Sequence, residues 1–199
     1  MKKLFLLTTL SVALQAAPLT VFNTGVDPAN VVLAAGSVDP HYVGITPSST
    51  VFVLSTVNAF WIPNDAVSKW VGPDPGEGSG SYSLIYRTTV DLTGFDASTA
   101  IINGRWATDN TGTDILLNGV STGQTSSTFL SYASFALTSG FVSGLNTIDF
   151  AWTNISGPGG VRVEFTSADA SPIGGAVPEP ASLALMGAGL AALAYFRRR

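Results

Sequence analysis

Cysteine is missing from this 199-residue chain, and histidine occurs only once, as His41. A chain without cysteine forms no disulfides, so its stability has to come from a packed hydrophobic core. His41 alone cannot supply the several strong ligands that zinc requires, and no thiol is present to act as a nucleophile. These absences exclude zinc and cysteine chemistry, and we expect the protein to need no cofactor.

Basic residues are also scarce between the two ends of the chain. Residues 18–176 hold four of them, Lys69, Arg87, Arg105 and Arg162, against twelve acidic residues, for a formal net charge of −8. Proteins that bind nucleic acid carry a basic patch or stripe that neutralises phosphates. Because this region has none, we do not expect nucleic acid as a partner, whereas neutral glycans and cations stay open.

Long hydrophobic runs occur only at the two ends, and the first has the form of a secretory signal peptide. Two lysines precede the apolar run 4–14, and small residues follow as far as Ala17. This order of charge, apolar stretch and small residues is typical of a segment that is removed during export. We therefore assign residues 1–17 to a signal peptide. Small residues at 11–13 provide an earlier cleavage site, so the cleaved bond stays open.

The second run, residues 181–196, contains no charged residue and is rich in alanine and leucine. As a helix it would rise about 24 Å, slightly less than the roughly 30 Å hydrocarbon core of a bilayer. The chain then closes with Arg197, Arg198 and Arg199, a basic cluster that should stay on the cytoplasmic side of the membrane. We predict a temporary membrane anchor, with everything between the two hydrophobic runs on the far side.

The residues between these runs show the period of two that is typical of half-buried strands. In the stretch 81–92, tyrosine, leucine and valine alternate with polar residues. Further short strands are predicted at 31–33, 42–45, 50–55, 99–107, 114–117, 128–137, 145–153 and 160–166. Asn118-Gly119 favours a tight hairpin turn, since both residues tolerate positive φ. Eight or nine short strands without a long amphipathic helix predict an all-β fold, an antiparallel two-sheet sandwich of the jelly-roll type.

This β-sandwich should occupy residues 18–166 as a single domain, because the region between the runs is long enough for one core but not for two. Small and turn-forming residues dominate the stretch 167–176, which we interpret as a flexible linker. The remaining residues, 177–199, form a separate C-terminal segment with the hydrophobic run at its centre.

Four tryptophans are the most conspicuous candidates for ligand contact, because aromatic faces can stack on sugar rings. Trp106 and Trp152 fall within predicted strands, so we assign them to the core. Trp61 and Trp70 flank the loop-like stretch 62–65. We take Trp61 and Trp70 as the candidate glycan contacts.

Residues 109–114 place oxygen-bearing side chains around a glycine, as a calcium-binding loop requires. Asp109, Asn110 and Asp114 are the candidate ligands. No acidic residue closes the loop in the manner of an EF-hand, and a β-turn stabilised by aspartate and asparagine side chains has the same composition. We favour the β-turn and expect no metal here.

The sequence offers little for catalysis. Residues 119–123 match the Gly-x-Ser-x-Gly spacing of serine hydrolases, but neither a helix nor a histidine follows them. Two of the twelve acidic residues could meet as the carboxylate pair of a glycoside hydrolase. Most of the aspartates, however, flank glycine, proline or threonine, where they cap turns. We expect a protein that is not an enzyme, with a glycan hydrolase as a further alternative.

A short motif, Val177, Pro178, Glu179 and Pro180, precedes the C-terminal hydrophobic run. The two prolines keep this motif extended and outside the helix, where an enzyme can reach its backbone. Together with the apolar run and the arginine cluster it resembles the PEP-CTERM sorting signal of environmental Gram-negative bacteria. The resemblance implies recognition by an exosortase, an integral-membrane processing enzyme, in an organism that makes exopolysaccharide.

The preceding domain is similar to ectodomains often found ahead of such tails, in residues 68–71, 86–93 and 104–110. More loosely, the path from Trp106 to the turn at 118–119 resembles a strand pair of galactose-binding-like jelly rolls. That fold hosts glycan binders, structural modules and enzyme appendages, so the resemblance implies an architecture more than an activity.

These features predict an exported protein that begins as a precursor anchored in the inner membrane and ends at the cell surface or in the extracellular matrix. We expect it to contact exopolysaccharide through a shallow site on the sandwich. The alternative is a purely structural surface or biofilm component without a discrete ligand. Its mark would be burial of Trp61 and Trp70 in the core.

Overall fold

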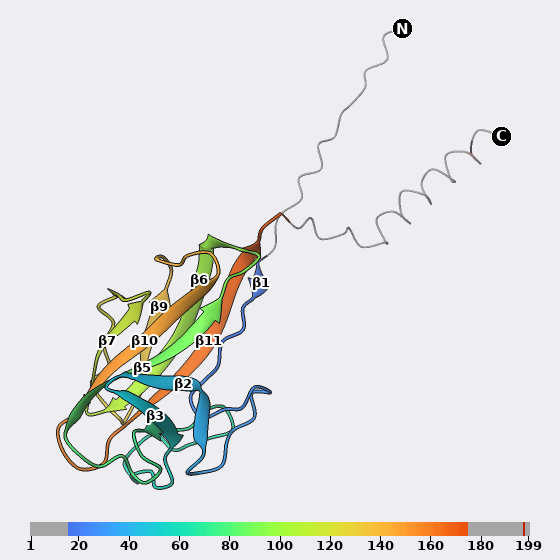
Figure 1. Ribbon diagram of the computed structural model, residues 1–199. Coiled ribbons are helices and arrows are strands. Elements are labelled where there is room, and N and C mark those ends of the chain that lie inside the picture. The colour runs from blue at the N-terminus through green and yellow to red at the C-terminus, as the bar shows by residue number, and fades with distance from the viewer. Residues whose placement is uncertain (1–15, 175–196, 198–199) are drawn as a thin grey trace.

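Antiparallel strands make up most of the region that the computed structural model describes, residues 16–174 together with Arg197 (Figure 1). In chain order the strands are β1 (Ala17–Pro18), β2 (Val38–Thr46), β3 (Ser48–Val53), β4 (Val71–Gly72), β5 (Tyr82–Asp91), β6 (Phe95–Asp109), β7 (Thr111–Leu117), β8 (Val120–Ser121), β9 (Ala133–Leu137), β10 (Leu145–Asn154) and β11 (Gly160–Pro172). The described residues contain no helix, and so none long and apolar enough to cross a bilayer. The predicted all-β fold is confirmed. Most of the predicted signal peptide, the sorting motif and the C-terminal hydrophobic run lie outside the described residues.

All strands belong to one curled sheet in the order β8-β7-β10-β5-β2-β3-β4-β11-β6-β9, with β1 added beside β11. Every pairing is antiparallel. The curl brings the two ends of the sheet face to face across the core. The ring of Trp106 on β6 lies 5.5 Å from that of Phe150 on β10, and Phe135 on β9 lies 5.8 Å from the same ring. The two layers of the sandwich are therefore parts of one continuous sheet.

Alternation along the strands puts large apolar side chains into this core. On β10, Ile148, Phe150 and Trp152 are all buried; of the two positions between them, Ala151 is half-buried and Asp149 is buried in an ion pair with Arg87. Trp106 and Trp152, which the sequence assigned to the core, are confirmed as core residues. With the chain free of disulfides, such burial of apolar area is the main source of stability.

The predicted tight turn at Asn118-Gly119 joins β7 to β8, and both residues have positive φ, 53° and 79°. Asn118 also fixes the start of β10. The Nδ2 of its side chain donates to Asn146 Oδ1 at 2.8 Å, and the Oδ1 of its side chain accepts from the Thr147 amide at 3.0 Å. The turn therefore holds the sheet edge in register as well as reversing the chain.

The predicted linker at 167–176 is wrong over most of its length, because β11 continues to Pro172. The late part of this strand pairs with β6 on one side and with β1 on the other, where Ala17 lies opposite Ala170. Ala168 and Ala170 are buried against the core. Small side chains that alternate in this way have a composition typical of linkers, and only the pairing identifies them as a strand.

Pairing of β1 with the end of β11 brings the two ends of the described domain together. Figure 1 shows β1 and the end of β11 at the end of the domain away from β3. The loops around β3 and β4 therefore lie at the opposite end from both termini of the described region.

Candidate functional site

The segment between β3 and β4, residues 54–70, folds over the outer face of β6 and β11, and we call it the covering loop. Its two ends are joined by Leu54 N–H, which donates to the Trp70 carbonyl at 3.0 Å, and β4, which follows the loop, pairs with β11. In its middle, the Ile62 amide donates to the Phe129 carbonyl at 3.0 Å. This loop decides which parts of the outer face remain accessible.

Trp61 and Trp70, the predicted glycan contacts, lie beneath the covering loop. Their exposed fractions are 3% and 0%, and together with Leu54 and Ala107 they form a second, smaller hydrophobic core. Each indole N–H is satisfied inside the protein: Trp61 donates to Asp109 Oδ2 at 2.9 Å and Trp70 to the Ile62 carbonyl at 2.8 Å. Neither ring presents a face for stacking, so the expectation that they are exposed is wrong.

Phe60 is the aromatic side chain that the covering loop does expose, with 77% of its surface accessible. The Phe60 amide donates to Asn58 Oδ1 and the Trp61 amide to the Asn58 carbonyl, both at 3.0 Å. This turn directs one of two adjacent aromatic rings outward and the other inward. Both residues are aromatic and adjacent, so the sequence does not indicate that the Phe60 ring is the exposed one.

A network of charged and hydroxyl groups lies between the covering loop and the sheet. We call it the ion cluster; it consists of Asp65, Ser68, Arg105, Tyr132, Arg162 and Glu164. Glu164 is its buried centre. Glu164 Oε1 accepts from Ser68 Oγ at 2.7 Å, Tyr132 OH at 2.6 Å and Arg162 at 3.1 Å, while Oε2 accepts from Arg105 Nε at 2.6 Å.

The ion cluster keeps its buried carboxylate ionised. Burial alone would raise the pKa of Glu164, but the hydrogen bonds from Tyr132, Ser68 and Arg105 outweigh it, and the pKa lies below its ordinary value of 4.5. Burial raises the pKa of Tyr132, as does its hydrogen bond to Glu164, so the phenol stays protonated. The group at the centre is therefore a hydrogen-bond acceptor without a proton to give.

Arg162 is the buried cation of the ion cluster, with its side chain 0% exposed. It pairs with Glu164 and with Asp65 Oδ2, the latter at 2.8 Å, and it also donates to Ser68 Oγ and the Pro63 carbonyl. Since a buried charge is tolerated only when it is paired and hydrogen-bonded, these contacts tie the covering loop to β11.

The side chain of Arg105 extends from the ion cluster to the molecular surface. Its side chain is 45% exposed, and its guanidinium lies over the Tyr132 ring, 4.3 Å from the centroid. Glu164 below it and Tyr132 beside it hold the guanidinium in one orientation. The position marks the border between the covered part of the sheet and its open part.

Beyond Arg105 the outer face of β6 and β9 forms a groove of about 480 Å³. Its lining comes from four parts of the chain and consists of Asn103, Gly104, Arg105, Gln124, Ser134, Phe135, Ala136 and Thr166. Asn103, Ser134 and Thr166 contribute amide and hydroxyl groups to this lining. We call it the β6–β9 groove.

Gly104 shapes the floor of the β6–β9 groove. A Cβ at this position would approach the Phe135 ring to 2.3 Å and the Glu164 carbonyl oxygen to 2.6 Å. The absent side chain lets Phe135 pack against β6 and reach the core, where it also meets Phe165 edge to face. The period of two predicted for 99–107 places Asn103 and Arg105 on one face, but nothing in the sequence brings Ser134 or Thr166 to them.

A second cavity, of about 370 Å³, lies along the other side of β9, against β7 and β8. Its lining consists of Leu117, Val120, Ser121, Thr122, Gln124, Ala136, Leu137, Thr138, Ser139 and Gly140. We call it the β8–β9 cavity. Hydroxyl groups and apolar side chains line it, and none of these residues is charged.

The three candidate calcium ligands are already engaged within the protein. Asp109 accepts from the Trp61 indole and from Asn110, whose own Oδ1 accepts from the Ile155 amide. Asp114 lies on β7, where its Oδ1 accepts from the Gly123 amide at 3.0 Å. Burial raises the pKa of Asp109, against the lowering effect of the Trp61 hydrogen bond. Among the residues that the structure describes, no three acidic or histidine side chains gather as a metal site.

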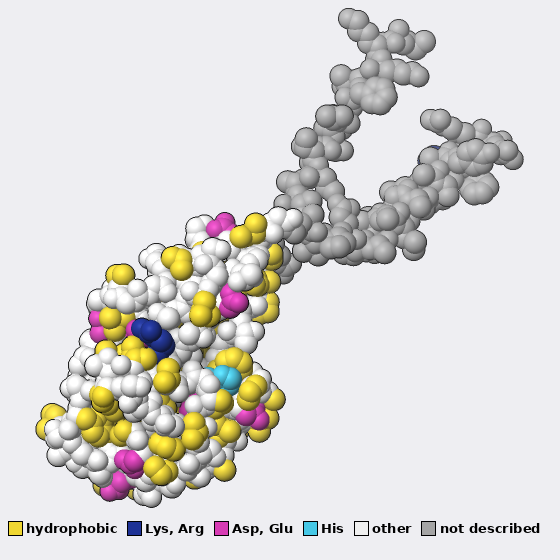
Figure 2. Space-filling view, viewed as in Figure 1, with side chains coloured by type: hydrophobic (Ala, Val, Ile, Leu, Met, Phe, Trp, Pro, Cys, Tyr) yellow, Lys and Arg dark blue, Asp and Glu magenta, His cyan; other side chains and the backbone are white. Residues whose placement is uncertain are grey.

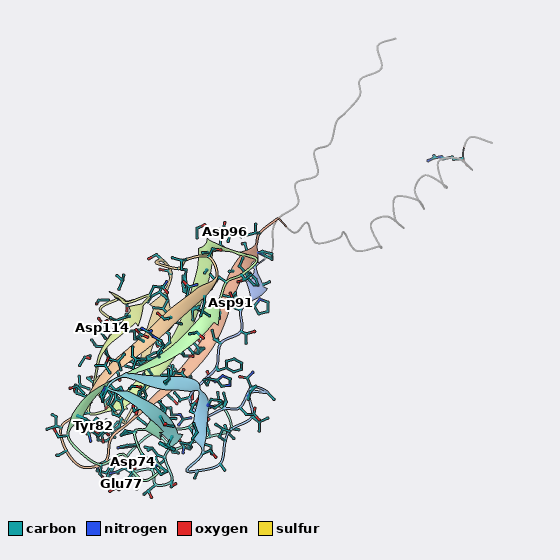
Figure 3. All side chains as sticks on the ribbon, viewed as in Figure 1. Asp74, Glu77, Tyr82, Asp91, Asp96 and Asp114 are labelled. Atoms are coloured by element: carbon teal, nitrogen blue, oxygen red, sulfur yellow. The ribbon has the colours of Figure 1, made fainter. Side chains whose placement is uncertain are left out.

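Several of the remaining acidic residues cap turns, as predicted. Asp74 accepts from the Gly76 amide, Asp91 from the Thr93 amide and Asp96 from the Ser98 amide. The hydrogen bonds lower the pKa values of Asp91 and Asp96. Figure 3 shows Asp91 and Asp96 near the end of the domain where the chain termini leave, with Asp74 and Glu77 at the opposite end.

Comparison with known proteins identifies the C-terminal segment. A family model described as the PEP-CTERM protein-sorting motif matches residues 176–199. The chain thus carries this sorting motif, which implies export and a membrane-anchored precursor that is sorted to the cell surface. The motif predicted from Val177, Pro178, Glu179 and Pro180 is confirmed.

No curated protein sequence gives a significant match to the chain. Among solved structures, CBM35 from Paenibacillus barcinonensis resembles it with a TM-score of 0.34 and 17% sequence identity, over 59% of this chain and 92% of that one. A likeness of this extent does not assign a ligand. The candidate site therefore has to be judged by its own chemistry.

Proposed function

We propose that this protein is a non-catalytic surface protein whose sandwich associates with extracellular polysaccharide through the β6–β9 groove. Export begins with the N-terminal signal peptide, and an exosortase processes the chain at Pro178-Glu179-Pro180. The domain then remains at the cell surface or in the matrix that surrounds the cell.

The β6–β9 groove is the observation that carries this proposal. It has the volume of a small-molecule site, for which roughly 300–1,000 Å³ is usual. Amide and hydroxyl groups of Asn103, Ser134 and Thr166 are suited to the hydroxyls of a sugar. Arg105 adds a guanidinium that Glu164 and Tyr132 hold in place, so a ligand need not immobilise it.

The ion cluster supports a binding role over a hydrolytic one. A glycoside hydrolase needs one carboxylic acid that can protonate the leaving oxygen. Glu164, the carboxylate that pairs with Arg105 at the groove, is buried, accepts four hydrogen bonds and has a lowered pKa. A group in that environment positions Arg105 and does not donate a proton.

The competing function is that of a purely structural surface component. Burial of Trp61 and Trp70 favours it, because that burial removes the stacking platform on which the first hypothesis depended. The groove can bind a ligand without those rings, through hydrogen bonds and the Arg105–Tyr132 pair. Its affinity should be modest, with dissociation constants of about 1 µM to 1 mM.

The experiment removes the hydrogen-bonding groups of the groove. Residues 16–174 contain both hydrophobic clusters and every strand pairing described here, so this domain can be prepared without its flanking segments. Its binding would be measured on a glycan array and by affinity electrophoresis in gels that contain neutral polysaccharides. The double variant Asn103→Ala/Ser134→Ala should weaken binding about tenfold, since a net hydrogen bond is worth roughly 0.5–1.5 kcal/mol.

Ser143→Ala provides the matched control, because Ser143 is exposed and does not line the groove. It should bind like the unmodified domain, and all three proteins should have the same melting temperature. If the unmodified domain binds no polysaccharide at millimolar concentration, the structural role replaces the proposed one.

A further inference from the structure

The β6–β9 groove and the β8–β9 cavity adjoin each other along β9. Gln124 and Ala136 line both of them, so the two meet where the loop after β8 reaches the middle of β9. We call the combined depression the trough. It begins at Arg105 and extends past the end of β9 to Gly140.

The length of the trough exceeds what one sugar ring can occupy. From Ser134 to Thr138 the lining follows β9 and its continuation for about 13 Å, at roughly 3.3 Å per residue. Beyond that it includes Ser139 and Gly140. Each half alone already has the volume of a small-molecule site.

Gln124 divides the two halves without closing either of them. Its Oε1 accepts from the Ala136 amide at 2.7 Å, and its Nε2 donates to the Ala136 carbonyl and to Thr122 Oγ1, both at 3.1 Å. The carboxamide pairs with the edge of β9 much as a neighbouring strand would. It forms part of a rigid floor, and its hydrogen bonds to the protein leave it little to offer a ligand.

The charge of the trough favours an uncharged ligand. Arg105 is its single ionic residue, and Glu164 already neutralises that guanidinium. The domain around it, residues 16–174, has a formal net charge of −8, which opposes the approach of polyanions. On the face of the molecule that Figure 2 shows, most of the surface is uncharged or apolar, with several acidic side chains and one small basic patch.

From this geometry we propose that the trough binds the interior of a linear, uncharged polysaccharide, several sugar units at a time, rather than a chain end or a single sugar. The hydroxyls of Ser134, Ser121 and Ser139 are spread along it to meet successive sugars. Apolar Val120, which is 69% exposed, offers a surface for the C–H face of a ring. This inference rests on the proposed function and adds the class of its ligand.

The test is a ladder of oligosaccharides, from the monosaccharide to the octasaccharide, of the cello, manno and xylo series. Their binding to the full-length chain in detergent micelles would be followed by calorimetry. For the series that binds, affinity should rise at least tenfold with length and then reach a plateau. A charged polymer of the same length should bind more weakly.

Two variants block the far half of the trough from opposite walls, Ser139→Trp and Val120→Trp. Each should abolish the gain in affinity with length while the shortest ligand that binds keeps its affinity in the β6–β9 groove. Ser143→Trp, the same change in the same loop but outside the lining, should behave like the unmodified protein. Circular dichroism checks that each variant is folded, and two walls are used so that misfolding of one variant leaves the other to decide.

The outcomes separate the two proposals. If a monosaccharide binds as tightly as the octasaccharide, if charged polymers are preferred, or if both blocking variants keep the length dependence, the inference is overturned while polysaccharide binding stands. If no member of any ladder and no polymer binds, the proposed function fails together with the inference.

Discussion

Trp61 and Phe60 are neighbours in the covering loop, and one turn buries the Trp61 ring and exposes the Phe60 ring. Asn58 accepts hydrogen bonds from both of their amides, which points the phenylalanine ring to solvent and the indole toward Asp109. The indole is then enclosed between the loop and the sheet, in contact with the Trp70 ring at 4.5 Å. Trp61 therefore contributes to the stability of the fold and not to a binding surface.

Replacement of the two neighbours should have opposite consequences. Trp61→Ala should lower the free energy of unfolding by about 3–5 kcal/mol, because it opens a cavity and removes the indole donor from the Asp109 carboxylate. Phe60→Ala should change it by no more than about 0.5 kcal/mol, as is usual for exposed positions. Urea denaturation of residues 16–174 measures both. Equal effects of the two substitutions would contradict the burial described here.

At the scale of elements, the ion cluster connects the covering loop, β6, β11 and the segment before β9. Glu164 lies 96 residues after Ser68 and 59 after Arg105, so its contacts close long stretches of chain. The same carboxylate leaves Arg162 paired and Arg105 oriented. The position of the loop and the border of the groove therefore depend on one buried group.

Because of this dependence, the free energy of unfolding should fall in acid, where Glu164 becomes protonated. Because the pKa of Glu164 is lowered by folding, its contribution is fully present above the ordinary value of 4.5 and is lost as the pH falls through the lower folded value. Glu164→Gln should lower the free energy of unfolding at pH 7 by about 3–5 kcal/mol, since Arg162 then lacks its buried partner. It should also reduce the loss between pH 5 and pH 3. Urea denaturation across this pH range measures both effects.

Glu77→Gln is the matched control for that substitution. Glu77 is exposed and its carboxylate accepts only from the Ser79 hydroxyl, so the stability and its pH dependence should hardly change. A Glu164 variant with unchanged acid sensitivity would show that the ion cluster does not hold the covering loop in the way described.

For the whole molecule, the extension of β11 to Pro172 sets the boundary between the folded domain and the sorting segment. The end of β11 lies between β1 and β6, and its small side chains close the core at the end where both flanking segments leave. Only a few residues then separate the last paired residue from Pro178. A processing enzyme at the membrane would meet the folded domain close to the motif it cleaves.

Two truncations distinguish the domain from its signal. A chain that ends at Gly174 should keep the melting temperature of the full domain and should appear in the medium or periplasm, because it has lost the sorting segment and no strand. A chain that ends at Thr166 should melt many degrees lower, because it loses the pairings of β11 with β1 and the buried Ala168 and Ala170. Thermal unfolding and cell fractionation measure the two effects. If the chain that ends at Gly174 stayed at the cell surface, the sorting role of residues 177–199 would be contradicted.

Features that depend on neighbouring residues could be predicted from the sequence alone. The period of two predicted the longer strands, although residues 31–33 form only an isolated bridge at Val32. Tolerance of positive φ at Asn118-Gly119 predicted the hairpin. The motif at 177–180 predicted the sorting segment through its resemblance to the PEP-CTERM signal. The expectation that nucleic acid is not a partner also needed no coordinates, since it rests on a sum of charges. Each of these conclusions follows from the local chemistry of the chain.

The tertiary structure decided which residues meet and which are covered. Antiparallel pairing placed β9 beside β6, and the covering loop then buried Trp61 and Trp70 while it left the β6–β9 groove open. The alanines after residue 166 became a strand because β1 and β6 offered partners. Burial and pairing between segments far apart in the chain depend on strand order, and strand order is set by packing of the whole core, which no local pattern contains.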